Sequence, residues 1–375
     1  MHETKLVTRI LPVHIIHPRE EEEVAVNVGD EFESLIRTLG AKIVDRVIQK
    51  IDRPHYATYI GRGKLDQIIE LIKSANVDVV ALDAMLKPGQ LHAIQSVLSQ
   101  ANPSIEVWDR VDLILRIFEK HAVSLESKLQ IELARMNYMG PRIYGMGYVL
   151  SRQGGGIGVS GIGETNTELM RRHWRDQKKK ITDELKKISN SHQQQLDKRR
   201  RAGFKTVSIV GYTNAGKSTL FNVLSKKTKL EKDELFATLE SSVGKMYVPA
   251  LFQEILITDT IGFIRNLPPL LISAFKSTLM ESINADLILH IIDASDPEMS
   301  RKIEIVSEIL HDLGVTDSNI VYVFNKIDQA PHINRERIEN QYKEFSPMFI
   351  SAREKVGIDE IPACIGEKLL EKNKI

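Results

Sequence analysis

The feature that most constrains this chain is a glycine-rich stretch past its middle, in the sequence VSIVGYTNAGKSTLFNVL. An apolar run precedes the loop and a helical pattern follows it, so we expect a strand, a loop and a helix. Gly211 and the triplet Gly216-Lys217-Ser218 have P-loop spacing. In such a loop, backbone N–H groups surround the β-phosphate, the lysine neutralises phosphate oxygens and the serine ligates magnesium. The stretch predicts a nucleoside triphosphate site in a doubly wound α/β domain.

A second strand, FQEILITDTIG, ends in Asp259-x-x-Gly262. A carboxylate at this point is suited to hold magnesium through water, and the Gly262 N–H is suited to meet the γ-phosphate. Two threonines between the P-loop and this strand, Thr228 and Thr238, are candidates to close over the magnesium ion. The motif therefore adds metal and γ-phosphate contacts to the predicted site.

A third motif selects the base. The buried strand NIVYVFNKID delivers Asn325, Lys326 and Asp328 at its C-terminal end, where doubly wound sheets place ligands. An aspartate accepts from guanine N1–H and the exocyclic amine, both absent from adenine, so the wrong base would leave a buried carboxylate unpaired. Ser351-Ala352-Arg353, after the strand PMFI, adds backbone donors for guanine O6. Together, in this order, the motifs predict a GTP-hydrolysing domain over residues 202–375.

Residues 1–118 alternate short apolar runs with helical patterns, which predicts a small parallel sheet with helices on its faces. Asp30 is expected to cap a helix that ends at Gly40. The sequence Gly61-Arg62-Gly63-Lys64 precedes another helix. It fits either an anion site, and with it a second nucleotide, or a plain tight turn.

Residues 119–201 carry two long helical patterns, which predict an antiparallel helical hairpin. The first pattern is expected to stop at Gly140-Pro141, and the second to resume after Thr165, which forms a capping box with Glu168. The intervening loop, residues 140–163, holds nine of the 22 glycines. It is either a flexible connector or a loop that becomes ordered on a partner.

Charge is unevenly distributed along the chain. Residues 171–201 contain twelve Lys or Arg and four Asp or Glu, a local excess of +8, whereas the whole chain carries +1. Such a run is usually a solvated helix face. Here it accompanies a glycine-rich tip with Arg142, Tyr144, Tyr148 and Arg152, and cations beside stackable rings suit folded RNA. We therefore expect the hairpin to bind RNA, and we expect no DNA partner.

The single cysteine, Cys364, cannot form an intrachain disulfide, and the first residues lack the apolar segment of a signal peptide. No apolar run approaches the roughly 20 residues that a membrane-spanning helix requires. These features predict a cytoplasmic protein without a membrane span.

The motifs GYTNAGKSTLFN, LFATLE, DTIGFIRNLP, ADLILHIIDASDP and NKID resemble the HflX family of translation-associated GTPases, as do SLESKLQIELARMNY, GPRIYG, LSRQGGGIG and GETNTE in the preceding segment. The resemblance implies a GTPase that binds the large ribosomal subunit through its N-terminal portion, is a monomer away from the ribosome, and takes part in splitting or rescuing ribosomes or in their biogenesis. It also identifies Thr238, within Phe236-Ala237-Thr238-Leu239-Glu240, as the threonine over magnesium. The sequence departs from the family pattern at Ile162, Asn166 and Thr167, which puts the RNA contacts of the loop in doubt.

The expected roles can be stated by residue. Lys217, Thr238 and Gly262 are expected to act in hydrolysis, and Ser218, Thr238 and Asp259 to bind Mg²⁺. The residues expected to line the GTP or GDP site are Gly211, Tyr212, Thr213, Asn214, Ala215, Gly216, Lys217, Ser218, Thr219, Phe236, Ala237, Thr238, Leu239, Glu240, Asp259, Thr260, Ile261, Gly262, Asn325, Lys326, Ile327, Asp328, Ser351, Ala352 and Arg353.

Two positions bear on the hydrolysis rate. Phe263 stands where many GTPases have glutamine, and its ring cannot hydrogen bond to water, so we expect slow activity in isolation and activation by a partner. The ring itself is expected to be a hydrophobic anchor. Asn214 either helps to hold a potassium ion beside the phosphates, as similar loops of translation-associated GTPases do, or stabilises the loop.

Two other function classes remain open. One is an RNA-binding module whose nucleotide pocket is not catalytic, against which the intact Lys217, Thr238 and Asp259 argue. The other is a nucleotide-driven RNA or protein remodeller that acts away from ribosomes.

Overall fold

The computed structural model describes residues 7–16, 22–153, 160–225, 242–260, 262–265, 267–268, 271 and 284–372. By backbone contacts the chain forms two compact units. One comprises Met1–Lys120 and Lys128–Glu184, and the other His121–Ser127 and Leu185–Ile375. The division into domains at residues 118 and 201 stays a prediction. Among the described residues, no helix is long and apolar enough to cross a membrane.

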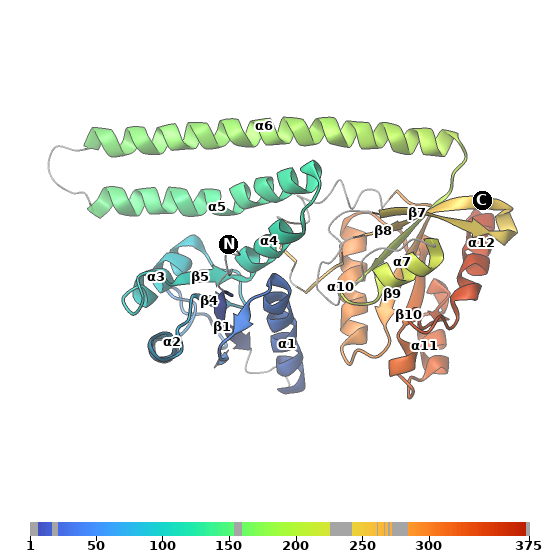
Figure 1. Ribbon diagram of the computed structural model, residues 1–375, viewed down its shortest axis with the longest axis horizontal. Coiled ribbons are helices and arrows are strands. Elements are labelled where there is room, and N and C mark those ends of the chain that lie inside the picture. Colours follow the sequence, from blue (N-terminus) through green and yellow to red (C-terminus); the bar gives the residue numbers. More distant parts are fainter. Residues whose placement is uncertain are drawn as a thin grey trace, which may run out of the picture. The chain divides into compact units, whose positions relative to one another are not determined.

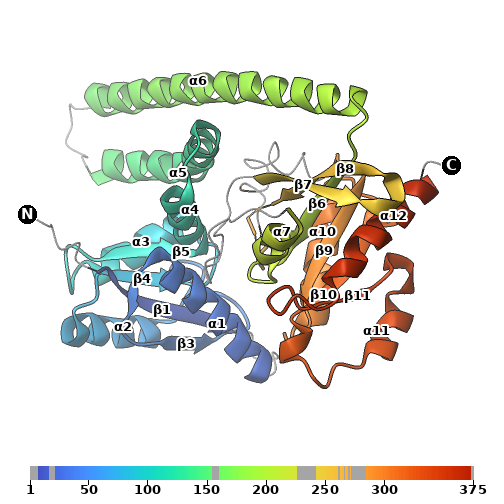
Figure 2. The ribbon, with the colours of Figure 1, turned by 45° about the vertical axis from the view of Figure 1, so that its right-hand side comes forward.

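The N-terminal sheet has five strands, all parallel, in the order β2-β1-β4-β5 with β3 also paired to β1 (Figure 2). Its strands are β1 (Arg9–Ile16), β2 (Lys42–Ile43), β3 (Val47–Lys50), β4 (Val79–Leu82) and β5 (Glu106–Asp109). The helices are α1 (Glu22–Leu39), α2 (Arg62–Ala75), α3 (Pro88–Leu98) and α4 (Arg110–His121). The predicted small parallel α/β domain is therefore confirmed.

Alternation along the strands directs apolar side chains to both faces of this sheet. Leu11 and Val13 of β1 pack in one core cluster with side chains of α2 and α3. His14, which points to the opposite face, lies edge-on to Phe32 of α1 at 5.9 Å between ring centroids. The sheet is therefore covered on both faces, as an all-parallel sheet requires.

Helix α1 differs from the sequence expectation at its start. It begins at Glu22 rather than at Asp30, so Gly29 lies inside the helix. One interior glycine costs a helix about 1 kcal/mol, whereas burial of side chains such as Phe32 and Ile36 stabilises it by about 1.5–3 kcal/mol each. The expected end is confirmed, because Gly40 follows the helix with a left-handed φ of 84°.

Helices α5 (Leu125–Gln153) and α6 (Ser160–Arg201) run antiparallel and side by side (Figures 1 and 2). The expected hairpin is confirmed, but its helix ends are wrong. Helix α5 continues through Gly140 and Pro141, and α6 begins before Thr165, so most of the expected loop at residues 140–163 is helical. An interior proline removes one backbone hydrogen bond and its ring crowds the carbonyl four residues earlier, at a cost of about 3 kcal/mol. The rest of the helix outweighs this cost here.

The C-terminal sheet has six strands in the order β11-β10-β9-β6-β8-β7, all parallel except β7, which is antiparallel to β8. The strands are β6 (Thr206–Gly211), β7 (Ser242–Val248), β8 (Gln253–Asp259), β9 (Leu287–Asp293), β10 (Ile320–Asn325) and β11 (Met348–Phe349). The helices are α7 (Lys217–Ser225), α10 (Met299–Asp312), α11 (Arg335–Gln341) and α12 (Ile361–Lys372). Short 3-10 helices are η1 (Pro249–Leu251), η2 (Asp317–Asn319), η3 (Ile327–Gln329), η4 (Lys343–Phe345) and η5 (Ile358–Glu360).

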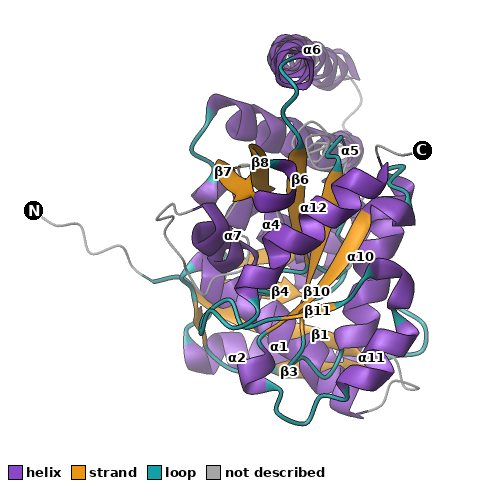
Figure 3. Cartoon of the chain, turned by 90° about the vertical axis from the view of Figure 1, so that its right-hand side faces the viewer, coloured by secondary structure: helices purple, strands orange, loops and turns teal. Residues whose placement is uncertain are grey.

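Two core clusters show that this sheet is doubly wound, with helices on both sides of its strands (Figure 3). Side chains of α7 and α12 pack with Val207 and Ile209 of β6. Side chains of α10 and α11 pack on the opposite face, with Val210 of β6 and Tyr322 of β10. The predicted P-loop domain is therefore confirmed, and the carboxyl ends of β6, β8, β9 and β10 meet at one edge.

Candidate functional site

The P-loop joins the end of β6 to the start of α7. Gly216 has a φ of 91°, and a Cβ there would lie 2.2 Å from Nδ2 of Asn325. Asn214 is exposed and also left-handed, with a φ of 62°. Asparagine is among the few residues other than glycine that adopt this conformation readily. The loop conformation therefore explains both the glycine and the asparagine.

The segment that follows β8 is fastened to the P-loop by backbone hydrogen bonds. The Thr213 N–H donates to the Phe263 carbonyl at 2.7 Å, and the Phe263 N–H donates to the Gly211 carbonyl at 3.0 Å. A Cβ on Gly262 would lie 2.7 Å from Cγ2 of Thr213 and 2.8 Å from Nζ of Lys217. Only glycine fits here, and the structure thus brings Gly262 against the amine of Lys217.

Lys217 is buried at the first position of α7, with 7% of its surface exposed. Its amine donates to the Tyr212 carbonyl at 2.7 Å. Desolvation lowers the pKa of Lys217 to about 8, with a smaller contribution in the same direction from the charge of Lys326, while Asp259 opposes the shift. A desolvated ammonium gains strongly from a bound polyphosphate, because the anion replaces the lost hydration.

Ser218 and Asp259 meet as the sequence predicted. The Ser218 hydroxyl donates to Oδ2 of Asp259 at 2.8 Å, and Asp259 is fully buried at the end of β8. A hydroxyl and a carboxylate supply the oxygen ligands that Mg²⁺ prefers, so the pair fits this ion. The neighbouring Thr260 instead directs its hydroxyl into the sheet, where it donates to the Ile209 carbonyl at 2.7 Å.

Phe263 is 2% exposed and packs in the same apolar cluster as Tyr212 and Phe324. Its burial confirms the interpretation of this ring as a hydrophobic anchor. The same cluster surrounds His290 of β9, which the sequence analysis missed because it lies within an apolar run. Burial, and to a smaller extent the charge of Lys217, lowers the pKa of His290 to about 3, so the imidazole is neutral.

Three of the four residues of the NKID motif have different environments. Asn325 is buried and ties the site together, since its Nδ2 donates to the Ala215 carbonyl at 2.8 Å and its Oδ1 accepts from the Ala352 N–H at 2.9 Å. The Lys326 amine pairs with Oδ2 of Asp293 at 2.7 Å. Asp328 is exposed in η3. Asp328 is thus open to solvent just beyond the strand end, whereas Asn325 joins the P-loop to the turn at Ala352 by hydrogen bonds.

Two of the three amides expected to serve guanine O6 are used within the protein. The Ser351 N–H donates to the Val356 carbonyl at 3.0 Å, and the Ala352 N–H donates to Asn325. Arg353 follows and is exposed. The turn therefore lies beside the base-selecting strand end, and Arg353 is its first residue outside these two bonds.

Some predicted residues lie outside the described part of the chain. They are Thr228, the segment Phe236-Ala237-Thr238-Leu239-Glu240, and Ile261. The side-chain positions of Arg142, Tyr144, Tyr148, Arg152, Ile162, Asn166 and Thr167 also lie outside the description. Their expected roles stay predictions.

Three family models match consecutive parts of the chain. A model described as the GTP-binding GTPase N-terminal region matches residues 27–119, and the GTP-binding GTPase middle region matches residues 121–199. A model described as a 50S ribosome-binding GTPase matches residues 206–326. The nucleotide site and the two preceding segments thus recur together in other proteins.

Curated relatives match over nearly the whole chain. GTPase HflX of Caldanaerobacter subterraneus is 38% identical over 370 residues, which cover 98% of this chain and 82% of the relative. GTPase HflX of Escherichia coli is 36% identical over 343 residues, 90% of this chain and 78% of the relative.

Among solved structures, a crystal structure of SsGBP in complex with GDP superposes with a TM-score of 0.54 at 25% identity. It covers 98% of this chain and 99% of its own. The match to the curated relatives extends far beyond the nucleotide pocket, and it decides the classification: the chain belongs to the HflX family of GTPases and hydrolyses GTP.

Proposed function

We propose that this GTPase binds the large ribosomal subunit through the α5–α6 hairpin and that the subunit stimulates GTP hydrolysis. The observation that carries the proposal is the excess of cations on α6, where Lys178, Lys179 and Lys180 are all exposed. A rigid helix with a local excess of +8 suits the phosphates of folded RNA. The description of the family model that matches residues 206–326 as a 50S ribosome-binding GTPase supports the same partner.

The pocket residues support distinct roles in this reaction. Lys217 would neutralise β and γ oxygens, and the Gly262 N–H would meet the γ-phosphate. Ser218 and Asp259 would hold Mg²⁺ together with Thr238, and the ion would supply charge neutralisation at the phosphates. Asp328 would accept from guanine. Each role follows from the placement described above, Thr238 excepted, which rests on the family resemblance.

The buried ring of Phe263 explains why a partner is needed. Its side chain packs in the apolar core instead of facing water, so it cannot orient the attacking water as glutamine does in other GTPases. Hydrolysis by the isolated protein is therefore slow, and the ribosome supplies or arranges the missing group. The cellular role that fits a cytoplasmic, subunit-bound GTPase is ribosome splitting, rescue or biogenesis.

Co-sedimentation with purified large and small subunits tests the proposal, in GDP and in a non-hydrolysable GTP analogue. We expect binding to the large subunit, stronger with the analogue, and a hydrolysis rate that rises strongly when large subunits are added. Replacing Lys178, Lys179 and Lys180 by glutamate should weaken binding and reduce its salt dependence, because fewer counterions are released. Hydrolysis that is equally fast with and without large subunits would contradict the proposal.

A remodeller that acts away from ribosomes is the second candidate. This candidate would need a second nucleotide site, and the sequence offers one at Gly61–Lys64 in the N-terminal domain. At Gly61–Lys64, the candidate anion site, the Gly61 N–H donates to Gln49 at 3.2 Å and the Lys64 amine donates to Gln67 at 2.9 Å. These contacts fit a tight turn, so the ribosomal proposal is preferred.

A further inference from the structure

A groove of about 340 Å³ lies between α5 and α6, within one compact unit. It is lined by Glu132, Arg135, Met136 and Met139 of α5 and by Trp174 and Gln177 of α6. The two helices lie side by side here in Figures 1 and 2. The groove is thus a feature of the hairpin itself, and none of its lining residues belongs to the GTP site.

The floor of the groove is apolar and its aromatic wall is a single ring. Met136 is buried, and Met139 and Trp174 are partly exposed. Trp174 is the one Phe, Tyr or Trp in the sequence of α6. Thioether and indole groups offer a polarisable surface against which a flat ring packs well.

Two cations of α6 share the helix face of Trp174. Arg171 precedes Trp174 by three residues and Lys178 follows it by four, so both lie on the same helix face as the ring. At a rise of 1.5 Å per residue they are separated by about 10 Å along the helix. A ligand that places a flat ring on Trp174 therefore has positive charge on either side of it.

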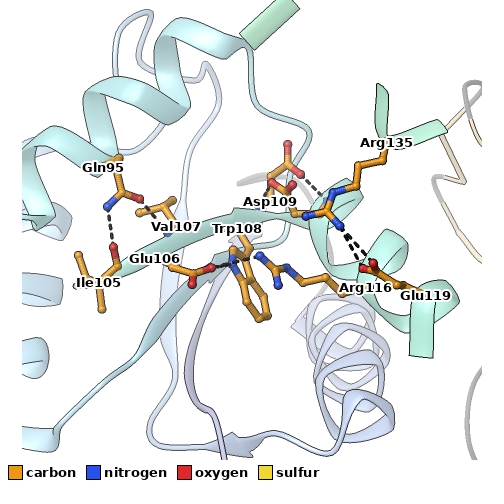
Figure 4. Close-up of polar contacts among 10 residues, drawn as sticks. Gln95, Ile105, Glu106, Val107, Trp108, Asp109, Arg116, Glu119 and Arg135 are labelled. Carbon is orange, nitrogen blue, oxygen red and sulfur yellow. Dashed lines mark hydrogen bonds and ion pairs between the residues drawn. The ribbon is translucent and has the colours of Figure 1, made fainter. Parts of the chain in front are cut away.

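Helix α5 contributes one cation and one anion to the lining of the groove, Arg135 and Glu132. The Arg135 guanidinium is paired with Glu119 of α4, with both N–O distances at 3.2 Å (Figure 4). Both side chains of this pair are more than half exposed, so it contributes little to stability. Glu132 is the acidic residue among the described residues that line the groove. The charge balance around Trp174 therefore favours a polyanion.

We propose that this groove binds one unpaired nucleobase of an RNA strand, stacked on Trp174, while neighbouring phosphates contact Lys178 and Arg171. A polyanion that also carries flat rings is a nucleic acid, and the ring must be unpaired because a base within a duplex is already stacked on both faces. The inference rests on the proposed RNA-binding role of the hairpin and adds the kind of RNA that it recognises.

The chain has two tryptophans, which provides a direct readout. Trp108 is buried in β5, 3.9 Å from the Arg116 guanidinium, so a Trp108→Phe variant leaves Trp174 as the only tryptophan. We would titrate this variant with a ten-nucleotide uridine strand, with an abasic strand of equal length, and with an RNA duplex. Quenching of Trp174 fluorescence by the uridine strand alone is expected, because only that strand offers accessible bases.

Substitution then separates stacking from charge. Trp174→Leu should weaken binding of the uridine strand about 5- to 150-fold, the range of one base–aromatic stack, and should leave the slope of log K against log salt unchanged. Trp174→Phe should keep most of the affinity. Lys178→Ala should instead lower the salt slope by about one phosphate contact. Unchanged GDP affinity and an unchanged denaturation midpoint in Trp174→Leu would show that its fold is intact.

Equal quenching by the abasic and uridine strands, or equal affinity of Trp174→Leu and the unsubstituted chain for the uridine strand, would overturn the inference. Large-subunit binding that is lost in Trp174→Leu without any loss of RNA affinity would also overturn it and would assign the groove to a protein. The same variants are sedimented with large subunits. If the unsubstituted chain binds subunits while Trp174 does not respond to bases, the inference alone fails. If the chain does not bind subunits, the proposed function fails.

Discussion

The N-terminal sheet and the mainly parallel C-terminal sheet use their carboxyl edges differently. At the edge of the C-terminal sheet, glycine-containing loops and exposed Asp328 face outward around buried Lys217. At the corresponding edge of the N-terminal sheet, the Arg110 guanidinium pairs with Asp83, at 2.6 Å, and with Glu31. The carboxyl edge of a parallel sheet can thus be occupied by the protein's own charged side chains, and the fold alone does not specify a nucleotide site.

The difference lies in which groups the protein leaves for a ligand. Arg110 is 2% exposed and its charge is neutralised inside the protein, which raises its pKa. Lys217 is also buried, but its amine donates to a backbone carbonyl, and desolvation lowers its pKa. A buried cation that already has carboxylate partners is structural, whereas a buried cation that lacks hydration and is held at a P-loop is suited to bind phosphate.

Breaking the N-terminal ion cluster should have the largest effect. Arg110→Ala leaves two carboxylates, of Asp83 and Glu31, without their shared cation in a buried place. We expect it to lower the free energy of unfolding by about 3–5 kcal/mol, measured by urea denaturation followed through Trp108, which is buried in the same sheet.

An exposed pair of the C-terminal sheet gives the matched control. Lys245 and Glu254 pair at 3.0 Å with both side chains more than half exposed, so Lys245→Ala should change stability by at most about 1 kcal/mol. The GDP affinity of folded Arg110→Ala should be unchanged. If Arg110→Ala and Lys245→Ala lower the free energy of unfolding by the same amount, the N-terminal ion cluster does not have the stabilising role assigned to it.

Substitution of Asp328 at the carboxyl edge of the C-terminal sheet should change nucleotide specificity and leave the free energy of unfolding unchanged. Asp328→Asn replaces an acceptor with an amide that cannot accept from both guanine N1–H and the amine. Loss of two charge-assisted hydrogen bonds should cost about 3 kcal/mol or more, roughly 100-fold in GTP affinity. Affinity for xanthosine triphosphate should rise, because its N1/C2 edge complements an amide. Unchanged GTP affinity at unchanged stability would remove Asp328 from the base site.

The buried lysine of the nucleotide site should make GDP affinity depend on pH. The pKa of Lys217 is about 8 in the free protein, so the amine loses its charge as pH rises through this value. Phosphate binding needs the charged form, and GDP should bind about tenfold more weakly at pH 9 than at pH 7. The measurement is a calorimetric titration across this range.

Stability of the free protein should change in the opposite direction. The unfolded lysine has a pKa of 10.5, so between about 8 and 10.5 the unfolded chain binds more protons, and the contribution of Lys217 to stability rises with pH. Lys217→Arg is the control, since a guanidinium stays charged over this range. If Lys217→Arg shows the same decline in GDP affinity, the decline does not come from the lysine.

The nucleotide site was largely predictable because its chemistry is concentrated in short motifs at strand ends. The role of Asn325 was not, since its partners Ala215 and Ala352 lie 110 and 27 residues away and become neighbours only in the folded sheet. The N-terminal cluster was missed for the same reason, because Glu31, Asp83 and Arg110 share no local pattern.

The missed and misplaced elements have local causes. Strand β1 was not singled out although it pairs with three other strands, because Pro12 stands within it and proline argues against an inner strand. The predicted ends of α5 and α6 are wrong because the glycines and Pro141 within these helices resemble the signals that end a helix. Local breakers cost a few kcal/mol at most, and the surrounding structure can outweigh them.

The smallest effect on stability is expected at Asn214, whose contribution to the edge of the C-terminal sheet is the backbone conformation of the P-loop. Its φ of 62° is costly for residues other than glycine and asparagine. Asn214→Gly should therefore leave the free energy of unfolding nearly unchanged, and Asn214→Ala should lower it by about 1 kcal/mol. Equal stability of the two variants would exclude a conformational role.

Hydrolysis rates in potassium and in sodium, at constant ionic strength, test the alternative that Asn214 helps to hold a potassium ion. A potassium dependence that both substitutions abolish would add a cation site to the conformational role, because a monovalent cation there would neutralise charge growing between the β and γ phosphates. Equal rates in both salts would leave Asn214 as the residue that lets the P-loop turn.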